Sequence, residues 1–532
     1  MARIRWKANI RLGKGLALSK SGKTTFPRIL PTTNEEESMP NDFDAVIIGS
    51  GAGGGPIAWK LVNAGKQVAI IEAGGFYTTN DFSRFELLAL RNLWWKPRWT
   101  SNYELGLDDE IALGMGRCVG GSTTIFTAVA HRMPDWNYKE WFDASEVRNE
   151  NGDTFGPNDL DQFYNRVEKD TGVREYTEWD EGMKRINQGF TKLGHPFHPV
   201  HAFVSPQCDQ SGCLFGCPTE AKRGTLVSYI IPSVLLGAQI FYNSTVTRIL
   251  FDSKKETSGE NPRAKGVEFI DDKGQVRRLT SKIVIVAAGA LNTPFLLFDS
   301  QFDEVSEFSP SSKQVGQNFG VNTAAIVFGK YNDVLNNWLL HPLSGHMEEF
   351  AQKEKGGFLL EASEVMEGPL SFSEFIVDEE GVPLWGSRQK QILKDYKYYA
   401  GVFLNIHDSN DGRIFRDKET GQEKFYKPVT AEDKKKFEKA RVMCREAFHA
   451  SGAKETLDSI YASHHVQGSC RMGDDVGKSV VNSDLESHDV KGLYIVDGSV
   501  LPSVIDANPS LTIMALSLRA GERILERKVL EE

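Results

Sequence analysis

The sequence predicts a mixed α/β fold made of two interleaved parts. Residues 44–75 have the pattern of a β-strand, a glycine-rich turn, a helix and a second strand, which is typical of a parallel βαβ unit. A second strand-to-helix boundary follows at 283–294, and a third, at 493–512, lies more than 400 residues after the first. We therefore expect both ends of the chain to return to one sheet, with the middle of the chain inserted as a separate part.

Length and composition limit the number of domains and the classes of function. At 532 residues and 59.3 kDa the chain should hold two or more domains. A net charge of −10 gives no support for nucleic-acid binding, and the absence of an 18-residue apolar run predicts no transmembrane helix. Six cysteines do not make a disulfide scaffold in this length, which favours an intracellular protein, cytoplasmic or peripheral to a membrane.

The first 34 residues differ in charge from the rest. They carry eight Lys or Arg and no acid before Glu35, and they contain no continuous apolar segment, so no secretory signal is expected. We expect residues 1–41 to form a basic, flexible, solvated arm. A contact with an anionic membrane surface and an organelle transit peptide are the alternatives.

The glycine-rich turn carries the strongest motif. Gly49, Gly51 and Gly54 form G-x-G-x-x-G directly after the β run 45–48. Such glycines allow a tight turn and let a pyrophosphate approach backbone N–H groups at a helix N-terminus. The next β run ends at Glu72, whose carboxylate can accept hydrogen bonds from both hydroxyls of an adenosine ribose. The unit predicts dinucleotide binding without distinguishing FAD from NAD.

The remaining elements follow in chain order. A second glycine-rich turn at 116–124, with Gly120, Gly121 and Ser122, suggests backbone pressed against a ligand. Residues 245–290 alternate like a β-meander and end in a buried strand. Residues 325–430 mix aromatic β-like pieces with charged loops, as expected of a substrate-facing sheet. A helix should begin at Thr430, whose hydroxyl can cap it.

At these positions the chain resembles the glucose–methanol–choline (GMC) family of FAD oxidoreductases. The resemblance runs from about Asp42 to Ile524 and is carried by four blocks, 49–72, 116–130, 283–297 and 465–512. Within the family the blocks look most like long-chain fatty-alcohol oxidases and their bacterial relatives. The features are Arg132-Met-Pro-Asp135, Phe215-Gly-Cys-Pro218, Lys222-Arg-Gly-Thr225, Gly468-Ser-Cys-Arg-Met-Gly473 and Asp497-Gly-Ser-Val-Leu-Pro502.

The resemblance implies a Rossmann-like FAD-binding domain interleaved with an antiparallel-sheet substrate domain. Residues 42–325 would form the first part of the FAD domain, 326–460 mainly the substrate domain, and 461–532 the return to the FAD domain. The FAD contacts that it implies are Gly49, Gly51, Gly54, Glu72, Gly120, Gly121, Ser122, Val246, Asp497 and Pro509. Some members attach FAD to a histidine at the position of Ile125, so here the resemblance implies non-covalent FAD.

The resemblance also places the catalytic residues. His465, in His-x-x-Gly-Ser, matches the general base, and an imidazole has a pKa suited to that role. Asn508, before Pro509, matches its partner, whose amide can donate to the alcohol or alkoxide oxygen. We expect the neighbouring His464 to be structural, since adjacent side chains of an extended segment point to opposite sides.

Three of the six cysteines lie close together in sequence, at Cys208, Cys213 and Cys217. Their spacing is similar to the end of ferredoxin motifs and to a segment that carries an iron–sulfur cluster in sugar dehydrogenases of the family. The three thiolates could bind a [3Fe-4S] cluster, bind zinc with a fourth ligand such as His201, form one disulfide, or pack. We expect Cys118, Cys444 and Cys470 to be packing residues.

Three functions are consistent with the sequence. The first is oxidation of an alcohol, long-chain or bulky and apolar, to the carbonyl by hydride transfer to flavin N5, with His465 as base and with O2, a quinone or a redox protein as electron acceptor. The second is a sugar dehydrogenase that passes electrons through an iron–sulfur cluster to a cytochrome. The third is an FAD protein without alcohol-oxidising activity. An optical spectrum would distinguish flavin alone from flavin with iron–sulfur.

Overall fold

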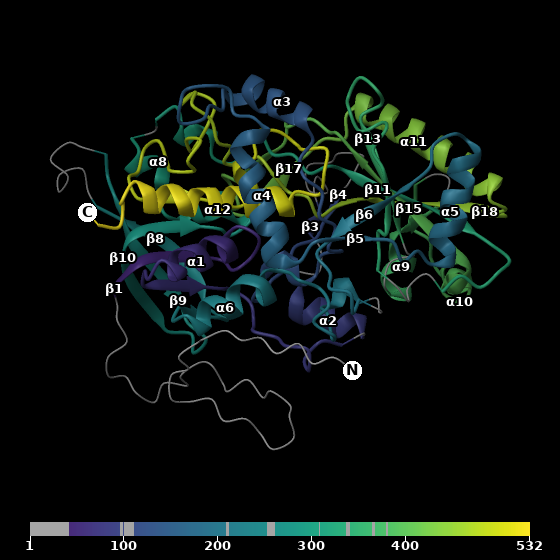
Figure 1. The fold of residues 1–532 in the computed structure, drawn as a ribbon, viewed down its shortest axis with the longest axis horizontal. Coiled ribbons are helices and arrows are strands. Elements are labelled where there is room, and N and C mark those ends of the chain that lie inside the picture. The colour runs from purple at the N-terminus through teal and green to yellow at the C-terminus, as the bar shows by residue number, and fades with distance from the viewer. Residues whose placement is uncertain are drawn as a thin grey trace, which may run out of the picture. The chain divides into compact units, whose positions relative to one another are not determined.

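The computed structural model describes residues 42–83, 85–95, 99–100, 111–208, 212–252, 261–307, 309–336, 341–363, 368–378 and 381–531. These residues belong to one unit, which begins at Asp42 (Figure 1). The basic arm expected over 1–41, with its membrane contact, lies outside the described residues.

The first of two large sheets has strand β1 (Asp42–Ile48) near its middle. Its seven strands run in the order β7-β2-β1-β10-β9-β8, and β20 also pairs with β10. The pairs β2–β7, β1–β2, β1–β10 and β10–β20 are parallel. The other strands are β2 (Val68–Ile71), β7 (Gln239–Phe241), β8 (Thr245–Phe251), β9 (Ala264–Ile270), β10 (Val276–Val286) and β20 (Leu493–Ile495).

The return of both chain ends to this sheet is confirmed. Strand β20, near the C-terminus, pairs in parallel with β10, which in turn pairs with β1. The terminal helix α12 (Ser510–Glu526) packs on α1 (Gly54–Asn63), as Figure 1 shows in yellow and purple. The meander expected over 245–290 is confirmed as well, because β8, β9 and the first half of β10 form antiparallel pairs.

The second sheet has eleven strands in the order β3-β4-β19-β11-β15-β13-β12-β6-β5, with β18 on β11 and β14 on β18. All of its pairs are antiparallel except β4–β19. Its strands are β3 (Trp99–Thr100), β4 (Ile111–Leu113), β5 (Arg174–Tyr176), β6 (His198–Ala202), β11 (Ala324–Lys330), β12 (Gly345–Met347), β13 (Phe358–Ser363), β14 (Ile376–Val377), β15 (Tyr399–Ile406), β18 (Glu455–Ser459) and β19 (Tyr461–Ser463). A separate hairpin joins β16 (Arg413–Arg416) to β17 (Glu423–Tyr426).

Helices pack against this second sheet and complete its core. Helix α11 (Ala431–Ala450) packs against α5 (Glu181–Lys192) and buries the side chains of Phe437 and Phe448. Thr430 caps α11 as predicted, because its hydroxyl accepts from the Asp433 N–H (3.1 Å) while the Asp433 carboxylate accepts from the Thr430 N–H (3.0 Å). A second cluster lies under α9 (Pro369–Phe375) and α10 (Ser387–Asp395). The further helices are α2 (Glu86–Leu93), α3 (Asp135–Ser145), α4 (Pro157–Thr171), α6 (Ile231–Leu235), α7 (Asn292–Asp299) and α8 (Phe302–Val305).

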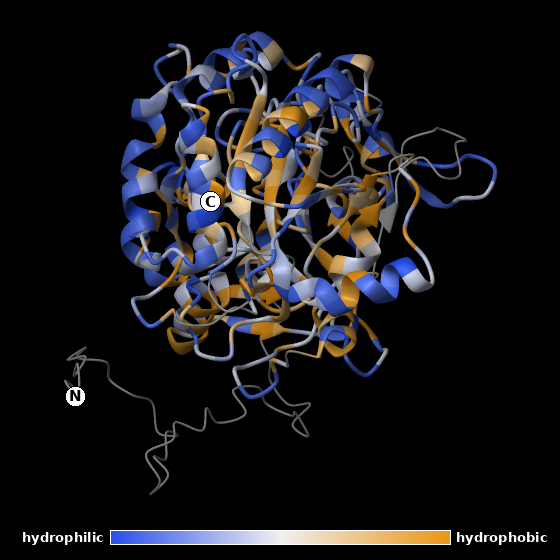
Figure 2. Ribbon diagram, turned by 90° about the vertical axis from the view of Figure 1, so that its right-hand side faces the viewer, coloured by the Kyte–Doolittle hydropathy of each residue, from blue (hydrophilic) through white to orange (hydrophobic). Residues whose placement is uncertain are grey.

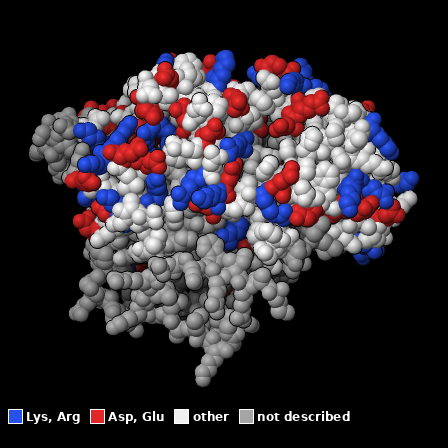
Figure 3. All heavy atoms as spheres, in the orientation of Figure 1, with Lys and Arg blue, Asp and Glu red and all other residues white. Residues whose placement is uncertain are grey.

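The surface separates polar from apolar side chains in the usual way. Figure 2 shows hydrophobic strands in the interior and hydrophilic residues along the outer helices. On the face shown in Figure 3, Lys and Arg side chains are interspersed with Asp and Glu. Among the described residues, no helix combines the length and the hydropathy needed to cross a membrane.

Candidate active site

A cavity of about 410 Å³ lies at the carboxyl ends of the parallel strands and extends to the second sheet. This edge is where open α/β sheets bind ligands. The residues that follow β1, β2, β10 and β20 all contribute to its wall, as do side chains of β11 and β15: Gly49, Glu72, Ala287, Asp497, Ile326 and Phe403.

The three glycines of the first motif have different physical roles. Gly49 has φ +97°, and a Cβ there would lie 2.3 Å from the Ala287 carbonyl oxygen. A Cβ on Gly54 would lie 2.0 Å from the Gly49 carbonyl oxygen. Gly51 lines the cavity, and a Cβ there would meet only Gly121 Cα at 3.7 Å. Gly49 and Gly54 are therefore required by the fold, while Gly51 leaves room for a ligand to approach the backbone.

The second glycine-rich turn packs directly against the first in the cavity wall. Gly120 and Gly121 have φ of +93° and +53°, and a Cβ on Gly121 would lie 2.8 Å from Gly51 Cα. The Gly120 N–H donates to Ser50 Oγ (2.9 Å), and the Thr225 hydroxyl donates to the Ser50 carbonyl oxygen (3.0 Å). The two turns thus form one cradle of backbone that side chains would fill.

Glu72 is buried at the end of β2. Its carboxylate accepts hydrogen bonds from Ser50 Oγ (2.7 Å), the Ser50 N–H (3.1 Å) and the Gly74 N–H (2.9 Å). Burial raises its pKa, and these donors work against that rise by stabilising the charged form. The sequence predicted a ribose contact for this carboxylate, and the structure places it in the cavity wall with its orientation fixed by Ser50 and Gly74.

Asp497 follows β20 and joins two strand ends. Its Oδ2 accepts from Thr293 Oγ1 (2.6 Å) and the Gly289 N–H (2.9 Å), and its Oδ1 accepts from the Ser499 N–H (2.8 Å). Burial raises the pKa of Asp497, and the same donors oppose that rise. The carboxylate therefore fixes the turns after β10 and β20 against one another at the cavity wall.

The other residues predicted to contact FAD divide into two groups. Ser122, Val246 and Pro509 line the cavity together with the residues described above. Gly54 and Gly120 are not part of its wall, and they support it through the close backbone packing at the two turns.

His465 and Asn508 meet in the wall of the same cavity. Asn508 Nδ2 lies 3.4 Å from His465 Nε2, and both residues line the wall. Desolvation by the surrounding protein lowers the pKa of the His465 ring to about 3, and the charge of His464 makes a smaller contribution. The His465 ring is therefore neutral near neutral pH, which is the form that a general base needs. His464 also lines the cavity, where its ring lies edge-on to Trp94 at 5.7 Å.

Glu361, in the middle of β13, is a residue of this site that the sequence prediction missed. It is fully buried, and its Oε2 accepts from Asn405 Nδ2 (2.7 Å) and, at 3.5 Å, from Asn508 Nδ2. Burial raises its pKa to about 7. The sequence signal that could have found it is a carboxylate inside an otherwise apolar strand, Phe358–Ser363.

An ion-pair cluster anchors the segment that carries Asn508. Asp506 accepts from Trp136 Nε1 (2.7 Å) and lies 2.7 Å from His407 Nδ1, while Glu140 lies 3.8 Å from the other ring nitrogen. Burial opposes the charged ring, but the hydrogen bond to Asp506 and the two carboxylates raise the pKa of His407. The cluster thus fixes the chain two residues before Asn508.

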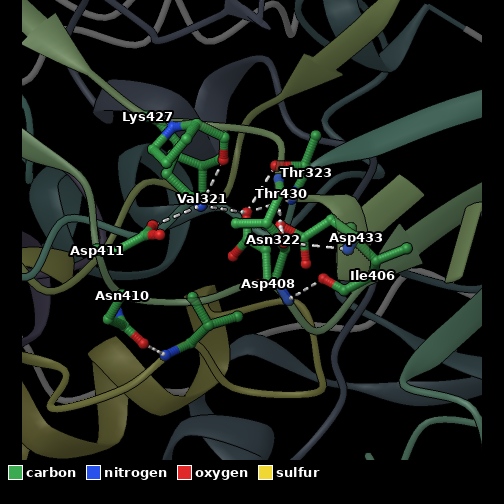
Figure 4. Close-up of polar contacts among 12 residues, drawn as sticks. Val321, Asn322, Thr323, Ile406, Asp408, Asn410, Asp411, Lys427, Thr430 and Asp433 are labelled. Atoms are coloured by element: carbon green, nitrogen blue, oxygen red, sulfur yellow. Dashed lines mark hydrogen bonds and ion pairs between the residues drawn. The ribbon is translucent and has the colours of Figure 1, made fainter. Parts of the chain in front are cut away.

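The second sheet holds the same segment from another side through Asn322 and Asn410, which Figure 4 labels. Asn322 Nδ2 donates to the Ile505 carbonyl oxygen (3.1 Å), and Asn410 Oδ1 accepts from the Val504 N–H (2.9 Å). Asn322 lies just before β11 and Asn410 just after β15, so the backbone of the catalytic segment is fixed to that sheet.

A buried lysine stabilises the loop that carries Asn410. Lys427 Nζ lies 3.2 Å from Asp411 Oδ1 and 3.7 Å from Asp408 Oδ2, as Figure 4 shows. Asp408 Oδ2 also accepts from Thr323 Oγ1 (2.6 Å). Burial opposes the charge of Lys427, but Asp408 and Asp411 raise its pKa.

The six cysteines are free thiols. Cys118, Cys444 and Cys470 are buried, and burial raises the pKa of Cys118 to about 12, as packing residues require. Among the described residues, the only tight grouping suited to a single metal ion is Glu140, His407 and Asp506, so Cys208, Cys213 and Cys217 do not form one. Lys222 Nζ donates to the Cys213 carbonyl oxygen (2.5 Å) and the Thr124 carbonyl oxygen (2.7 Å), which holds the cysteine segment against the cavity wall.

The cavity fits FAD. The backbone cradle at Gly51 and Gly121 is open toward the cavity at the N-terminus of α1, as a pyrophosphate requires, and Glu72 lies at the end of the neighbouring strand. His465 and Asn508, in the same wall, offer an imidazole nitrogen and an amide donor.

Comparison with known proteins identifies the family. The family models for the N- and C-terminal parts, both described as GMC oxidoreductase, match residues 59–324 and 404–517. The long-chain-alcohol oxidase FAO4B of Arabidopsis thaliana is 25% identical over 540 residues, covering 91% of this chain and 67% of that protein. The cholesterol oxidase of Acinetobacter baumannii is 23% identical over 562 residues, covering 92% of this chain and 96% of that protein.

Solved structures show the same fold. Pyridoxine 4-oxidase from Mesorbium loti superposes with a TM-score of 0.66 at 16% identity, covering 91% of this chain and 99% of that one. Formate oxidase from Aspergillus oryzae superposes with a TM-score of 0.66 at 14% identity, covering 93% and 100%. The chain therefore belongs to the GMC oxidoreductases, and it is an FAD-dependent oxidoreductase that acts on alcohols.

Proposed function

We propose that this enzyme oxidises long-chain or bulky apolar alcohols to the carbonyl, with His465 as the general base. The observation that supports it most is the pair formed by His465 and Asn508, 3.4 Å apart on the cavity wall. FAD, when bound, supplies the acceptor for the hydride that leaves the alcohol carbon. His465 accepts the hydroxyl proton, and the Asn508 amide donates to the oxygen as negative charge develops on it.

The wall of the cavity supports an apolar substrate. Aromatic and aliphatic side chains line it beside the catalytic pair, including Trp94, Trp95, Phe126, Val129, Leu343 and Phe403. The named relatives are long-chain-alcohol oxidases and a cholesterol oxidase, whose substrates are long or bulky and largely apolar. We propose non-covalent FAD, since Ile125 lines the cavity and has no group that could attach to a flavin. By analogy with the oxidases, we propose O2 as the electron acceptor.

The substrate proposal is tested by a chain-length series. Each methylene buried in an apolar channel contributes about 0.8 kcal/mol. Hence kcat/KM for linear primary alcohols should rise about fourfold per carbon until the channel is full. The measurement compares butanol, octanol and dodecanol, with octane-1,8-diol as a control that matches octanol in length but ends in a second polar group.

The same assay includes glucose and a sterol. We expect kcat/KM for the diol to be several-fold lower than for octanol, and glucose to be a poor substrate. A flat or falling series together with rapid turnover of glucose would overturn the apolar assignment and favour a sugar dehydrogenase. A rise with bulky sterols in place of linear chains would fix the substrate class as bulky apolar alcohols.

A further inference from the structure

Three ionisable side chains lie opposite one another on neighbouring strands of the second sheet. In the register of the antiparallel pairs β6–β12 and β12–β13, His346 pairs with His198 on one side and with Glu361 on the other. Residues directly opposite one another in such pairs have their side chains on the same face, about 5 Å apart. His198 is exposed and Glu361 is fully buried, so the row leads from solvent to the interior.

A fourth ionisable side chain, the ring of His131, lies between the buried members of this row. Its Nε2 is 4.0 Å from Glu361 Oε1, and its ring centre is 4.5 Å from that of His346. The ring of His346 is in turn 6.4 Å from that of His198. The Ala130 N–H donates to the His201 carbonyl oxygen (2.8 Å), which fixes the backbone before His131 against β6.

The facing atoms of the row have no partner within the described part of the chain. Glu361 Oε1, His131 Nε2 and His346 Nδ1 are buried and accept or donate no hydrogen bond there. Buried polar groups without partners are costly, and they are the usual partners of ordered water. The gap of 4.0 Å between His131 Nε2 and Glu361 Oε1 is one that a water bonded to both atoms can bridge.

The inner end of the row reaches the catalytic pair. Glu361 Oε2 accepts from Asn508 Nδ2 at 3.5 Å, and Asn508 Nδ2 lies 3.4 Å from His465 Nε2. A small cavity of about 10 Å³, about the size of one water molecule, is lined by His465 and Asn405 among others. Asn405 in turn donates to Glu361 (2.7 Å).

We propose that Glu361, His131, His346 and His198, the proton row, carry the proton released by alcohol oxidation from His465 to solvent. This inference rests on the proposed role of His465. In the reaction the C–H bond breaks with its electron pair, which leaves as hydride for FAD, and the O–H bond leaves its electrons on oxygen to form the carbonyl. The hydroxyl proton passes to His465, then through the row to bulk water at His198.

The direction of transfer follows from the environments of the two inner groups. The surrounding protein lowers the pKa of His465 to about 3, and burial raises that of Glu361 to about 7. A proton is therefore more stable on Glu361 than on His465. A water in the small cavity at His465 and Asn405 carries it across, since the Asn508 amide can only donate. Burial, with the charges of His198 and His201, lowers the pKa of His346 to about 4. The step from Glu361 to this ring is uphill, and a proton that reaches the ring leaves it readily for bulk water.

The test measures proton release and flavin reduction separately. FAD-loaded protein in weak buffer with a pH indicator is mixed without oxygen with dodecanol, and both absorbances are followed. In the unmodified enzyme one proton should appear in step with flavin bleaching. In His346→Gln the flavin should bleach within twofold of the normal rate, while proton release slows at least tenfold and is restored by added imidazole.

His488→Gln is the control, because His488 is a largely buried ring hydrogen-bonded to Ser479 (2.9 Å). Within the described residues no contact links it to the row. It should behave like the unmodified enzyme. Proton release that keeps pace with bleaching in His346→Gln, a lack of rescue by imidazole, or no proton release from the unmodified enzyme would each overturn the proton row. The role of His465 is judged separately, by flavin bleaching in His465→Ala.

Discussion

The two ionisable side chains nearest to Asn508 have their pKa values moved in opposite directions by the same low-dielectric environment. His465 is pushed toward the neutral ring and Glu361 toward the neutral acid, because desolvation penalises whichever form is charged. The result is a base that is free to accept a proton, beside a carboxyl whose ionised form can take that proton over near neutral pH. Acid and base roles at one site are commonly separated in this way.

The raised pKa of Glu361 has a consequence for stability. Its ordinary value is 4.5 and its folded value is about 7, so the folded state binds the proton more tightly than the unfolded state. The stabilising contribution is complete below pH 4.5 and is lost as the pH rises through 7. The resulting loss at alkaline pH is up to about 3 kcal/mol.

Glu361→Gln should therefore leave stability unchanged near pH 4 and raise it at pH 9. The free energy of unfolding in urea, measured for FAD-loaded protein at both pH values, is the readout. Glu354→Gln, at an exposed position shortly before β13, is the matched control and should change little at either pH. A pH-independent effect of Glu361→Gln would show that the carboxyl is ionised throughout.

At the scale of elements, the sequence predicted what local patterns determine. The βαβ unit at the N-terminus, the meander that includes β8 and the capped start of α11 are each specified within a few residues, by glycines, alternation or a capping threonine. The second sheet is different, because β3 to β6 come from well before residue 326 and join it through long-range pairing. Nothing local in those short segments specifies their partners.

The same distinction between local patterns and long-range pairing explains which residues of the site could be predicted. His465 and Asn508 could be predicted because each lies in a short motif that resembles a known family. Glu361 has only the weak signal of a carboxylate among apolar residues, and His131 has none. The two are brought together by the pairing of β12 with β13 and by a loop more than 200 residues earlier.

The cysteine segment provides a prediction at the scale of one element. Lys222 binds this segment through backbone oxygens, and we expect the thiols to act as packing groups. Cys213→Ser should cost about 1 kcal/mol of stability and leave flavin reduction and iron content unchanged. Cys444→Ser, on the buried face of α11, is the control and should cost a similar amount. The cysteine sulfurs around an iron–sulfur cluster lie farther apart than those around a single metal ion, so an iron measurement is needed to test for a cluster. Iron that is present in anaerobically purified protein and lost in Cys213→Ser would contradict the packing role.

At the scale of the whole molecule, the two sheets meet at one cavity. The first sheet contributes the glycine cradle and Glu72, while the second contributes Glu361 and the contacts that fix the catalytic segment. FAD binding should therefore stabilise both parts together, because the cofactor would contact the first and lie against the second.

Non-covalent FAD gives a prediction for the intact protein. Ile125 lies in the cavity wall, where an attaching histidine would be needed for a covalent link. Acid precipitation should release all of the flavin into the supernatant, as measured by its absorbance. Flavin that stays in the pellet after denaturation would contradict the prediction.

The central claim is that alcohols reduce the bound flavin with His465 as the base, and anaerobic stopped-flow absorbance tests it most directly. Dodecanol should bleach the flavin of the unmodified enzyme, and His465→Ala should slow the bleaching by about 10²- to 10⁴-fold at equal FAD content. His449→Ala, on the last turn of α11, should bleach at the normal rate. Bleaching of His465→Ala at the normal rate, or no bleaching of the FAD-loaded enzyme by any alcohol, would contradict the claim.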